Sequence, residues 1–215
     1  AFAMAGSVWS APPAKYDSLF VSDQSGVLTA FDVKTRATRW QFKASAGFST
    51  SASVYRGTLV IGSWDKNVYA LDAFTGQLLW QAATDGEMRS NVAVTPTEGI
   101  VVSRPGTVYR LALSDGSQIQ SIPLNVEVWS SPALAHSMIY VGATDGMIYA
   151  LGDPAKQTML AKTWTSFGAD SRHTGLAPTL GPTTIAPKIV INAGGGVNGS
   201  PVLDDAGNIY VGTSS

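Results

Sequence analysis

Short apolar runs alternate with polar, glycine-containing turns along most of the chain. Four of them have the length and the β-branched or aromatic content of a short strand; they are "LFVSD" (19–23), "LVIGS" (59–63), "GIVVS" (99–103) and "IYVGA" (139–143). A second run follows each of these, namely "LTAFD" (28–32), "VYALD" (68–72), "VYRLA" (108–112) and "IYALG" (148–152). No helical period competes over any long window, so the pattern predicts an all-β protein.

Both sets of runs repeat every 40 residues. The same spacing holds for an earlier segment, "VWSAP" (8–12), "FSTSA" (48–52), "MRSNV" (88–92) and "VWSSP" (128–132), and for a closing position occupied by Trp40, Trp80, Gln120 and Leu160. We therefore expect each 40-residue unit to form four short strands, which are lettered A to D in chain order. One such sheet cannot bury both of its faces, so neighbouring units must cover each other. Repeats of this length and strand number are typical of a β-propeller built from four-stranded antiparallel blades. We expect four nearly complete blades in residues 1–163.

The period fails after residue 160. The next A and B strands, "VNGSP" (197–201) and "NIYVGT" (208–213), come 69 to 70 residues after their counterparts instead of 40. We therefore expect residues 164–196 to form an irregular connector that ends in a D-like strand, "KIVINAGGG" (188–196), and residues 197–215 to form a partial blade. The favoured interpretation is a fragment of a longer propeller. The alternative is a small ring that the partial blade closes beside the N-terminal segment.

Composition narrows the choice of partners and compartments. The chain is 45% hydrophobic and 13% charged, with a net charge of −1, so no electrostatic argument favours nucleic acid or an anionic membrane surface. No run approaches the roughly 18 apolar residues of a membrane-spanning helix. The absence of cysteine excludes disulfides and thiolate chemistry. This composition fits a periplasmic or secreted bacterial protein without requiring one.

The hairpin "NVYALDAFTGQLLW" (67–80) carries a family resemblance. It is similar to the pyrroloquinoline-quinone-like, tryptophan-docking repeats of bacterial β-propellers, whose pattern is a strand ending in "YALD", a "TG" turn and a strand ending in Trp. Residues 28–40 match with Ala37 in place of the turn glycine, and the third unit is degenerate, with Gln120 at the docking position. The resemblance implies that Trp40 and Trp80 dock between blades. It says less about function, because these blades serve both enzymes and binding scaffolds.

Candidate binding residues are the positions that differ between blades, since packing favours sameness. In a propeller the D–A and B–C loops share one face, called the loop face below. The candidates on this face are Trp9, Trp64, Asp65, Glu87, Arg89, Arg104, Glu127, Trp129, Asp145 and Asn198. Aromatic walls with a few charges are typical of a binding site. The alternative is that Trp9 and Trp129 only fill the central channel.

No catalytic or metal-binding residue can be assigned from the sequence. His136 and His173 lack ligand spacing. Asp170, Ser171 and His173 are too close together for a triad, whose members normally come from separate elements. The stretch "DDAGN" (204–208) lacks the spaced ligands of an EF-hand loop.

The favoured interpretation is a non-enzymatic binding scaffold, in the non-catalytic branch of the family, that takes a protein partner or a small ligand on the loop face and can self-associate through open blade edges. The first alternative is a dehydrogenase of alcohols or sugars that uses pyrroloquinoline quinone with calcium. The resemblance implies an adjacent cysteine pair in many such enzymes, which this chain lacks, and only Glu87, Asn91 and Asp145 are loose calcium candidates. The second alternative is a carbohydrate-directed propeller, for which exposed aromatic residues are the only indication.

Overall fold

The fold is described from a computed structural model, in which residues 4–152, 181–204 and 206–214 are described. Four antiparallel sheets have four strands each. The first two consist of β1 (Ala14–Lys15), β2 (Ser18–Ser22), β3 (Val27–Asp32) and β4 (Thr38–Lys43), and of β5 (Ser53–Tyr55), β6 (Thr58–Gly62), β7 (Asn67–Asp72) and β8 (Leu78–Ala83). The next two consist of β9 (Ala93–Val94), β10 (Glu98–Val102), β11 (Thr107–Ala112) and β12 (Gln118–Pro123), and of β13 (Ala133–Ala135), β14 (Met138–Gly142), β15 (Met147–Gly152) and β16 (Pro187–Asn192). Two short pairs follow, formed by β17 (Gly196–Val197) with β20 (Thr213–Ser214) and by β18 (Val202–Leu203) with β19 (Ile209–Tyr210).

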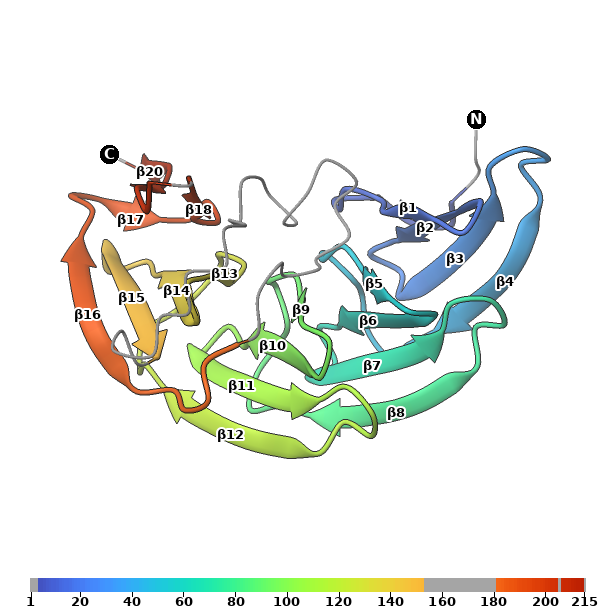
Figure 1. Cartoon of the computed structure of the whole chain (residues 1–215). Helices are drawn as coiled ribbons and strands as arrows, with labels where there is room; N and C mark the ends of the chain where they lie inside the picture. The colour runs from blue at the N-terminus through green and yellow to red at the C-terminus, as the bar shows by residue number, and fades with distance from the viewer. Residues whose placement is uncertain (1–3, 153–180, 205, 215) are drawn as a thin grey trace.

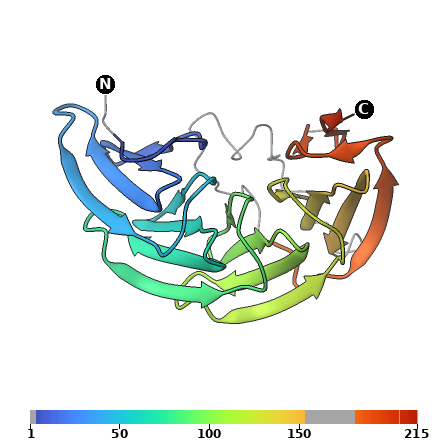
Figure 2. The same cartoon turned by 180° about the vertical axis from the view of Figure 1, so that it is seen from behind.

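The sheets are propeller blades arranged side by side in an arc (Figure 1). The D strands β4, β8, β12 and β16 form the outer rim, and the A strands lie inside. The first sheet and the pairs β17–β20 and β18–β19 lie at opposite ends of the arc, as the reverse view also shows (Figure 2). The predicted all-β propeller is confirmed. Within the described ranges the chain forms no helix of the length and hydropathy that a membrane crossing requires.

The fourth blade takes its outer strand from far along the sequence. β16 pairs with β15, and Ile189 lies opposite Ala150 in the register in which Trp80 lies opposite Ala70. The D-like strand expected in the connector is therefore the D strand of this blade. Ile189 occupies the closing position, where the 40-residue spacing had pointed to Leu160; that residue lies outside the described part of the chain.

The A strands begin later than the sequence pattern indicated. The second starts at Ser53, whereas "FSTSA" (48–52) precedes it. The reason is that, in the segment before each of these A strands, a side-chain hydroxyl and not the backbone amide makes the hydrogen bond to the B strand. Thr50 donates through Oγ1 to the carbonyl of Gly62 at 2.9 Å, and Ser90 and Ser130 do the same toward the B strands of their own blades at 2.7 and 2.8 Å.

A chain of hydrogen bonds links the blades just after these hydroxyls. The amide of Ser51 donates to Asn91 Oδ1 at 2.7 Å, the amide of Asn91 to Ser131 Oγ at 2.9 Å, and the amide of Ser131 to Ser200 Oγ at 2.9 Å. The last step spans 69 residues of sequence. It shows that "VNGSP" takes the same place as "VWSSP", despite the long insertion between them.

The two tryptophans within β4 and β8 reach into the next blade. Trp40 Nε1 donates to the carbonyl of Ala73 at 3.1 Å, and Trp80 Nε1 donates to that of Leu113 at 2.9 Å. Each indole lies on a glycine of the next C–D turn, since a Cβ at Gly76 or Gly116 would come within 2.6 or 2.5 Å of the ring. Both glycines also have φ of 74°, which other residues rarely adopt.

The third blade makes the same connection with a polar residue. Gln120 Nε2 donates to the carbonyl of Ile185, and the amide of Ile185 donates back to Gln120 Oε1, both at 3.0 Å. Arg110 adds a bond from Nη1 to the carbonyl of Thr183 at 2.9 Å, and it pairs with Glu98 at 2.6 Å. The blade that departs from the repeat pattern is therefore still tied to its neighbour, through an amide in place of an indole.

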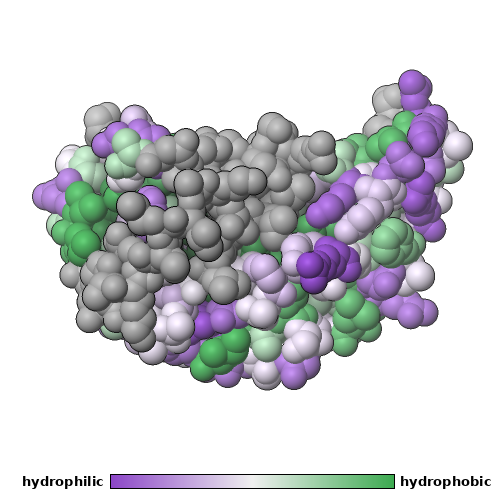
Figure 3. All heavy atoms as spheres, viewed as in Figure 1, coloured by the Kyte–Doolittle hydropathy of each residue, from purple (hydrophilic) through white to green (hydrophobic). Residues whose placement is uncertain are grey.

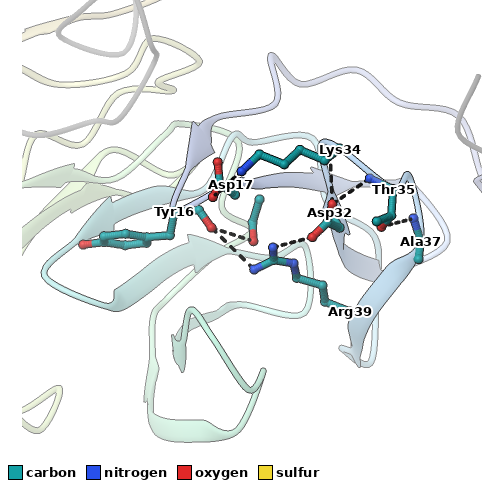
Figure 4. A network of polar contacts seen from close by, with 8 residues as sticks. Tyr16, Asp17, Asp32, Lys34, Thr35, Ala37 and Arg39 are labelled. Carbon is teal, nitrogen blue, oxygen red and sulfur yellow. Dashed lines mark hydrogen bonds and ion pairs between the residues drawn. The ribbon is translucent and has the colours of Figure 1, made fainter.

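The C–D turn of the first blade corrects one detail of the alignment. Arg36, with φ of 63°, and not Ala37, takes the place of the turn glycine. Asp32 closes this turn by accepting from the amides of Lys34 and Thr35 at 2.9 and 2.8 Å and from Arg39 at 2.5 Å (Figure 4). The Thr35 amide and then the Arg39 guanidinium hold the pKa of Asp32 well below its usual range. In the second blade, Asp72 closes the turn that receives the Trp40 indole in the same way, by accepting from the amides of Phe74 and Thr75 at 2.9 and 2.8 Å.

The two ends of the arc differ in chemistry. Hydrophilic residues gather over the first sheet, and apolar ones at the end where β16 lies (Figure 3). In β16, Ile189 and Val190 are 46% and 53% exposed, whereas Trp40 and Trp80 are 8% and 7% exposed. β16 therefore presents apolar surface at this end of the arc, and self-association through it stays a prediction.

Truncating a docking indole should destabilise the whole fold. We expect Trp80→Ala to lower the free energy of unfolding by about 3–5 kcal/mol, because it removes a buried ring between blades. Trp9→Ala is the matched control and should change it by less than about 0.5 kcal/mol, since Trp9 is 68% exposed. Urea unfolding followed by circular dichroism measures both values. Equal losses in the two variants would contradict the docking role.

Candidate functional site

Six of the ten predicted binding residues come together on the loop face. We call them the Trp–Arg cluster: Trp64, Glu87, Arg89, Arg104, Glu127 and Trp129. They come from the B–C turns of the second and third blades and from the D–A loops β8–β9 and β12–β13. Three neighbouring blades therefore build one site.

Arg89 is the centre of the cluster. Its guanidinium carbon lies 4.6 Å from the ring centroid of Trp64 and 5.4 Å from that of Trp129. Its Nε and Nη2 both donate to Glu87 Oε2, at 3.0 and 2.9 Å. Trp64 is itself fixed, because its Nε1 donates to Ser49 Oγ at 2.9 Å. The arrangement holds a usually flexible side chain in one conformation, with cation–π contacts on two rings.

Arg104 joins the two D–A loops. Its Nε donates to Glu127 Oε1 at 2.6 Å, its Nη1 lies 3.7 Å from Glu87 Oε2, and its guanidinium carbon is 5.5 Å from the Trp129 centroid. The hydrogen bond from Arg104 lowers the pKa of Glu127, and the same bond raises the pKa of Arg104. Two arginines and two glutamates leave the cluster with no net charge.

A hollow of about 430 Å³ opens beside the cluster. It is lined by Lys66, Asp85, Gly86, Glu87, Arg104, Pro105, Asn125, Val126 and Glu127. Lys66 and Asp85 are not among the binding residues predicted from the sequence. Lys66 carried a signal, because it stands where the B–C turns of the other three blades have Gly26, Gly106 and Gly146.

Four predicted site residues are not held in the cluster by any contact within the described residues. Asp65 accepts from the hydroxyl of Tyr69 at 2.7 Å, and Asp145 accepts from that of Tyr149, also at 2.7 Å. Burial and the bond to Asp145 raise the pKa of Tyr149 to about 12. These carboxylates therefore shape their own turns. Trp9 and Asn198 are exposed at the inner ends of other blades.

The described ranges contain no group of three His, Asp or Glu side chains placed to hold a metal ion. His136 has φ of 50° in the tight turn between β13 and β14. Asp204, in the "DDAGN" stretch, accepts from Ala206 and Asn208 of its own turn. Asp170, Ser171 and His173 lie outside the described residues.

The fold is that of a repeat propeller, and its loop face carries a cluster of side chains from three blades. A family model described as outer membrane protein assembly factor BamB matches residues 2–100 and 65–197, and the chain belongs to this family. The resemblance to pyrroloquinoline-quinone-like repeats is thereby confirmed, and the relatives that are named BamB are consistent with the non-catalytic branch.

The individual relatives include both an assembly factor and an enzyme. Outer membrane protein assembly factor BamB of Yersinia pestis is 27% identical over 150 residues, which cover 62% of this chain and 38% of the relative. A polyvinylalcohol dehydrogenase of a Pseudomonas species is 30% identical over 89 residues, 38% of this chain and 14% of that enzyme. The crystal structure of BamB from Moraxella catarrhalis superposes with a TM-score of 0.62 at 12% identity, covering 96% of this chain and 85% of that one. The matched part is thus well under half the length of these sequence relatives.

The ion pair in the cluster can be tested by titration. In the native protein we expect the Glu127 carboxyl to titrate below the ordinary glutamate pKa, because Arg104 stabilises its charged form. Arg104→Gln should return this pKa toward the ordinary value, whereas Arg39→Gln, at a surface pair on the first blade, should leave it unchanged. Carbon-13 NMR of the side-chain carboxyl groups measures the shift. An unaltered Glu127 titration in Arg104→Gln would contradict the pairing.

Proposed function

We propose that this chain is a propeller scaffold that binds a protein partner in outer-membrane protein assembly, and that it does so through the loop face. The Trp–Arg cluster is the observation that carries the proposal. Membership of the BamB family supports the protein-binding role. The proposal places the chain in the periplasm, the compartment next to the membrane that the relatives' name specifies.

The chemistry of the cluster suits contact with another protein. Tryptophan and arginine are the residue types that most often dominate binding energy at interfaces. Trp129 is 43% exposed, so part of its ring is available to a partner, while Arg89 and Arg104 are already ordered by their glutamates. Ordering in advance reduces the entropy lost on binding. Because the cluster has no net charge, we expect it to make specific contacts with the partner and not to attract it over long distances.

The cross-blade contacts of Trp40 and Trp80 contribute to the proposed function by keeping the loop face rigid. A surface built from loops of three blades keeps its geometry only while the blades keep their spacing. The bonds from the two indoles to Ala73 and Leu113 support that spacing. The proposed scaffold thus uses the repeated positions for rigidity and the variable positions for recognition.

The quinone-dehydrogenase alternative has less support from the site. Glu87 is engaged by Arg89 and lies close to Arg104. Asn91 Oδ1 accepts from the amide of Ser51, and Asp145 holds its own turn. All three loose calcium candidates thus have other partners. The exposed indoles of Trp9 and Trp129 suit a sugar as well as a protein, but the relatives' names favour the protein.

Site-specific photocrosslinking tests the proposed face. A photoreactive phenylalanine analogue replaces Asn125, which lines the hollow and is not a member of the cluster. Because Asn125 has φ of 58°, the melting temperature of this variant is compared with that of the wild type to check that the fold is kept. In bacterial cells the analogue should crosslink to a component of outer-membrane protein assembly, identified by mass spectrometry, at a yield several times that from position 74. Phe74 is the matched control because it is 55% exposed and lies in a C–D turn, on the opposite face.

A second substitution makes this experiment decisive. Trp129→Ala, added to the position-125 crosslinker, should reduce the yield severalfold because it removes the exposed indole. Equal crosslinking from position 74, or a yield that Trp129→Ala does not change, would contradict the proposal.

A further inference from the structure

Lys66 adopts a backbone conformation that its position in the fold reserves for glycine. The B–C turns of the first, third and fourth blades place Gly26, Gly106 and Gly146 there, with φ of 86°, 92° and 81°. Lys66 has φ of 69°. The left-handed region is unfavourable for a residue with a side chain. Because backbone strain is concentrated at functional sites, its presence at only one of these four equivalent turns points to a function for the Lys66 side chain.

The ammonium group of Lys66 has no hydrogen bond or ion pair within the described part of the chain, although acidic residues line the same hollow. Those acids have other partners. Asp85 accepts from Thr107 Oγ1 at 2.5 Å. Burial would raise its pKa, but hydrogen bonds from Ser103, Thr107 and Tyr109 outweigh burial and lower it.

The two glutamates of the hollow are likewise engaged by the arginines of the cluster. Glu87 accepts from Arg89, and Glu127 accepts from Arg104. The charges of these two glutamates are therefore matched by arginines, whereas Asp85 is hydrogen-bonded by neutral hydroxyls, and Lys66 lines the same hollow as a cation.

Arg104 offers further donors to the same hollow. Its Nε is used by Glu127, and its Nη1 is 3.7 Å from Glu87, longer than a hydrogen bond. Its Nη2 makes no hydrogen bond with the described residues. Lys66 and Arg104 lie on adjacent B–C turns, so two cationic residues line one hollow of about 430 Å³.

We propose that this hollow is a receptor for a carboxylate: it takes an Asp or Glu side chain of the protein partner between Lys66 and Arg104. The inference rests on the proposed function and specifies the chemistry of its partner. The two oxygens of one carboxylate can accept hydrogen bonds from the Lys66 ammonium and from Arg104 Nη2, neither of which has a partner among the described residues. A doubly charged phosphate or a nucleic acid would meet Glu87 and Glu127 at close range, and like charges repel. Trp129, beside Arg104, would cover an apolar residue next to the acid.

Two synthetic peptides test this specificity. Acetyl-Gly-Leu-Glu-Leu-Gly-amide should bind roughly three- to tenfold more tightly than the same peptide with Gln in place of Glu, because only the former carries the carboxylate. The measurement is an NMR titration that follows the indole N–H of Trp129 and the Nε–H of Arg104. The preference should weaken as NaCl is raised.

The chain offers a matched pair of variants. Lys66→Gly relieves the left-handed strain, so the melting temperature should be retained or rise while the preference for the Glu peptide falls to about one. Arg36→Gly relieves the same strain at the C–D turn of the first blade, on the opposite face, and should keep the preference. Lys66→Asn, which tolerates the turn, gives a second test of the lost charge.

Equal binding of the two peptides, or an unchanged preference in both Lys66 variants, would overturn the inference. Saturable binding of N-acetylglucosamine at Trp129 with no response to the Glu peptide would also overturn it, in favour of a carbohydrate ligand. If the position-125 crosslink succeeds while the peptide preference is absent, only the inference fails. If that crosslink fails, the proposed function fails.

Discussion

The contact on which the rest of the structure depends is the one between a D strand and the C–D turn of the next blade. Four short strands leave two apolar faces, so a single blade is not stable alone. Trp40 and Trp80 cross this boundary and combine ring burial with a hydrogen bond to a backbone carbonyl. The glycine beneath each indole is required both by its φ and by the closeness of the ring. Gln120 shows that the constraint is the cross-blade bond itself, since an amide also provides it.

The candidate site depends on this spacing between blades. Trp64 and Arg104 come from the B–C turns of two adjacent blades, and Arg89 and Trp129 from the D–A loops between three. A shift of one blade by a few ångströms would separate Arg89 from one of its two rings, since the cation–π contact extends to about 6 Å. The Ser–Asn hydrogen bonds along the inner ends of the blades hold the same spacing from the inside. The variable residues can therefore differ freely in chemistry without loss of their relative positions.

Much of this fold is readable from the sequence, because a strict 40-residue period fixes each strand relative to its blade. The loop face follows from topology, which is why six predicted residues meet there. The failures have physical causes. The period cannot foresee that the fourth blade closes with Ile189 after a long insertion. It also cannot show that Asp65 and Asp145 are taken by tyrosines four residues later, although this repeated spacing is visible once its meaning is known. The strain at Lys66 is signalled only by a missing glycine, and its neighbours in the hollow come from other loops.

The account is tested most directly by a double-mutant cycle across the boundary between the second and third blades. In the wild-type background, Gly116→Ala should destabilise the protein strongly, since the new Cβ would lie 2.5 Å from the Trp80 indole and φ is 74°. In a Trp80→Ala background the same change should cost only the backbone strain. The two free-energy losses should therefore fall short of additivity by about 1–3 kcal/mol. Additive losses would show that Trp80 and Gly116 do not act together, and would contradict the claim that these contacts hold the blades, and with them the site, in place.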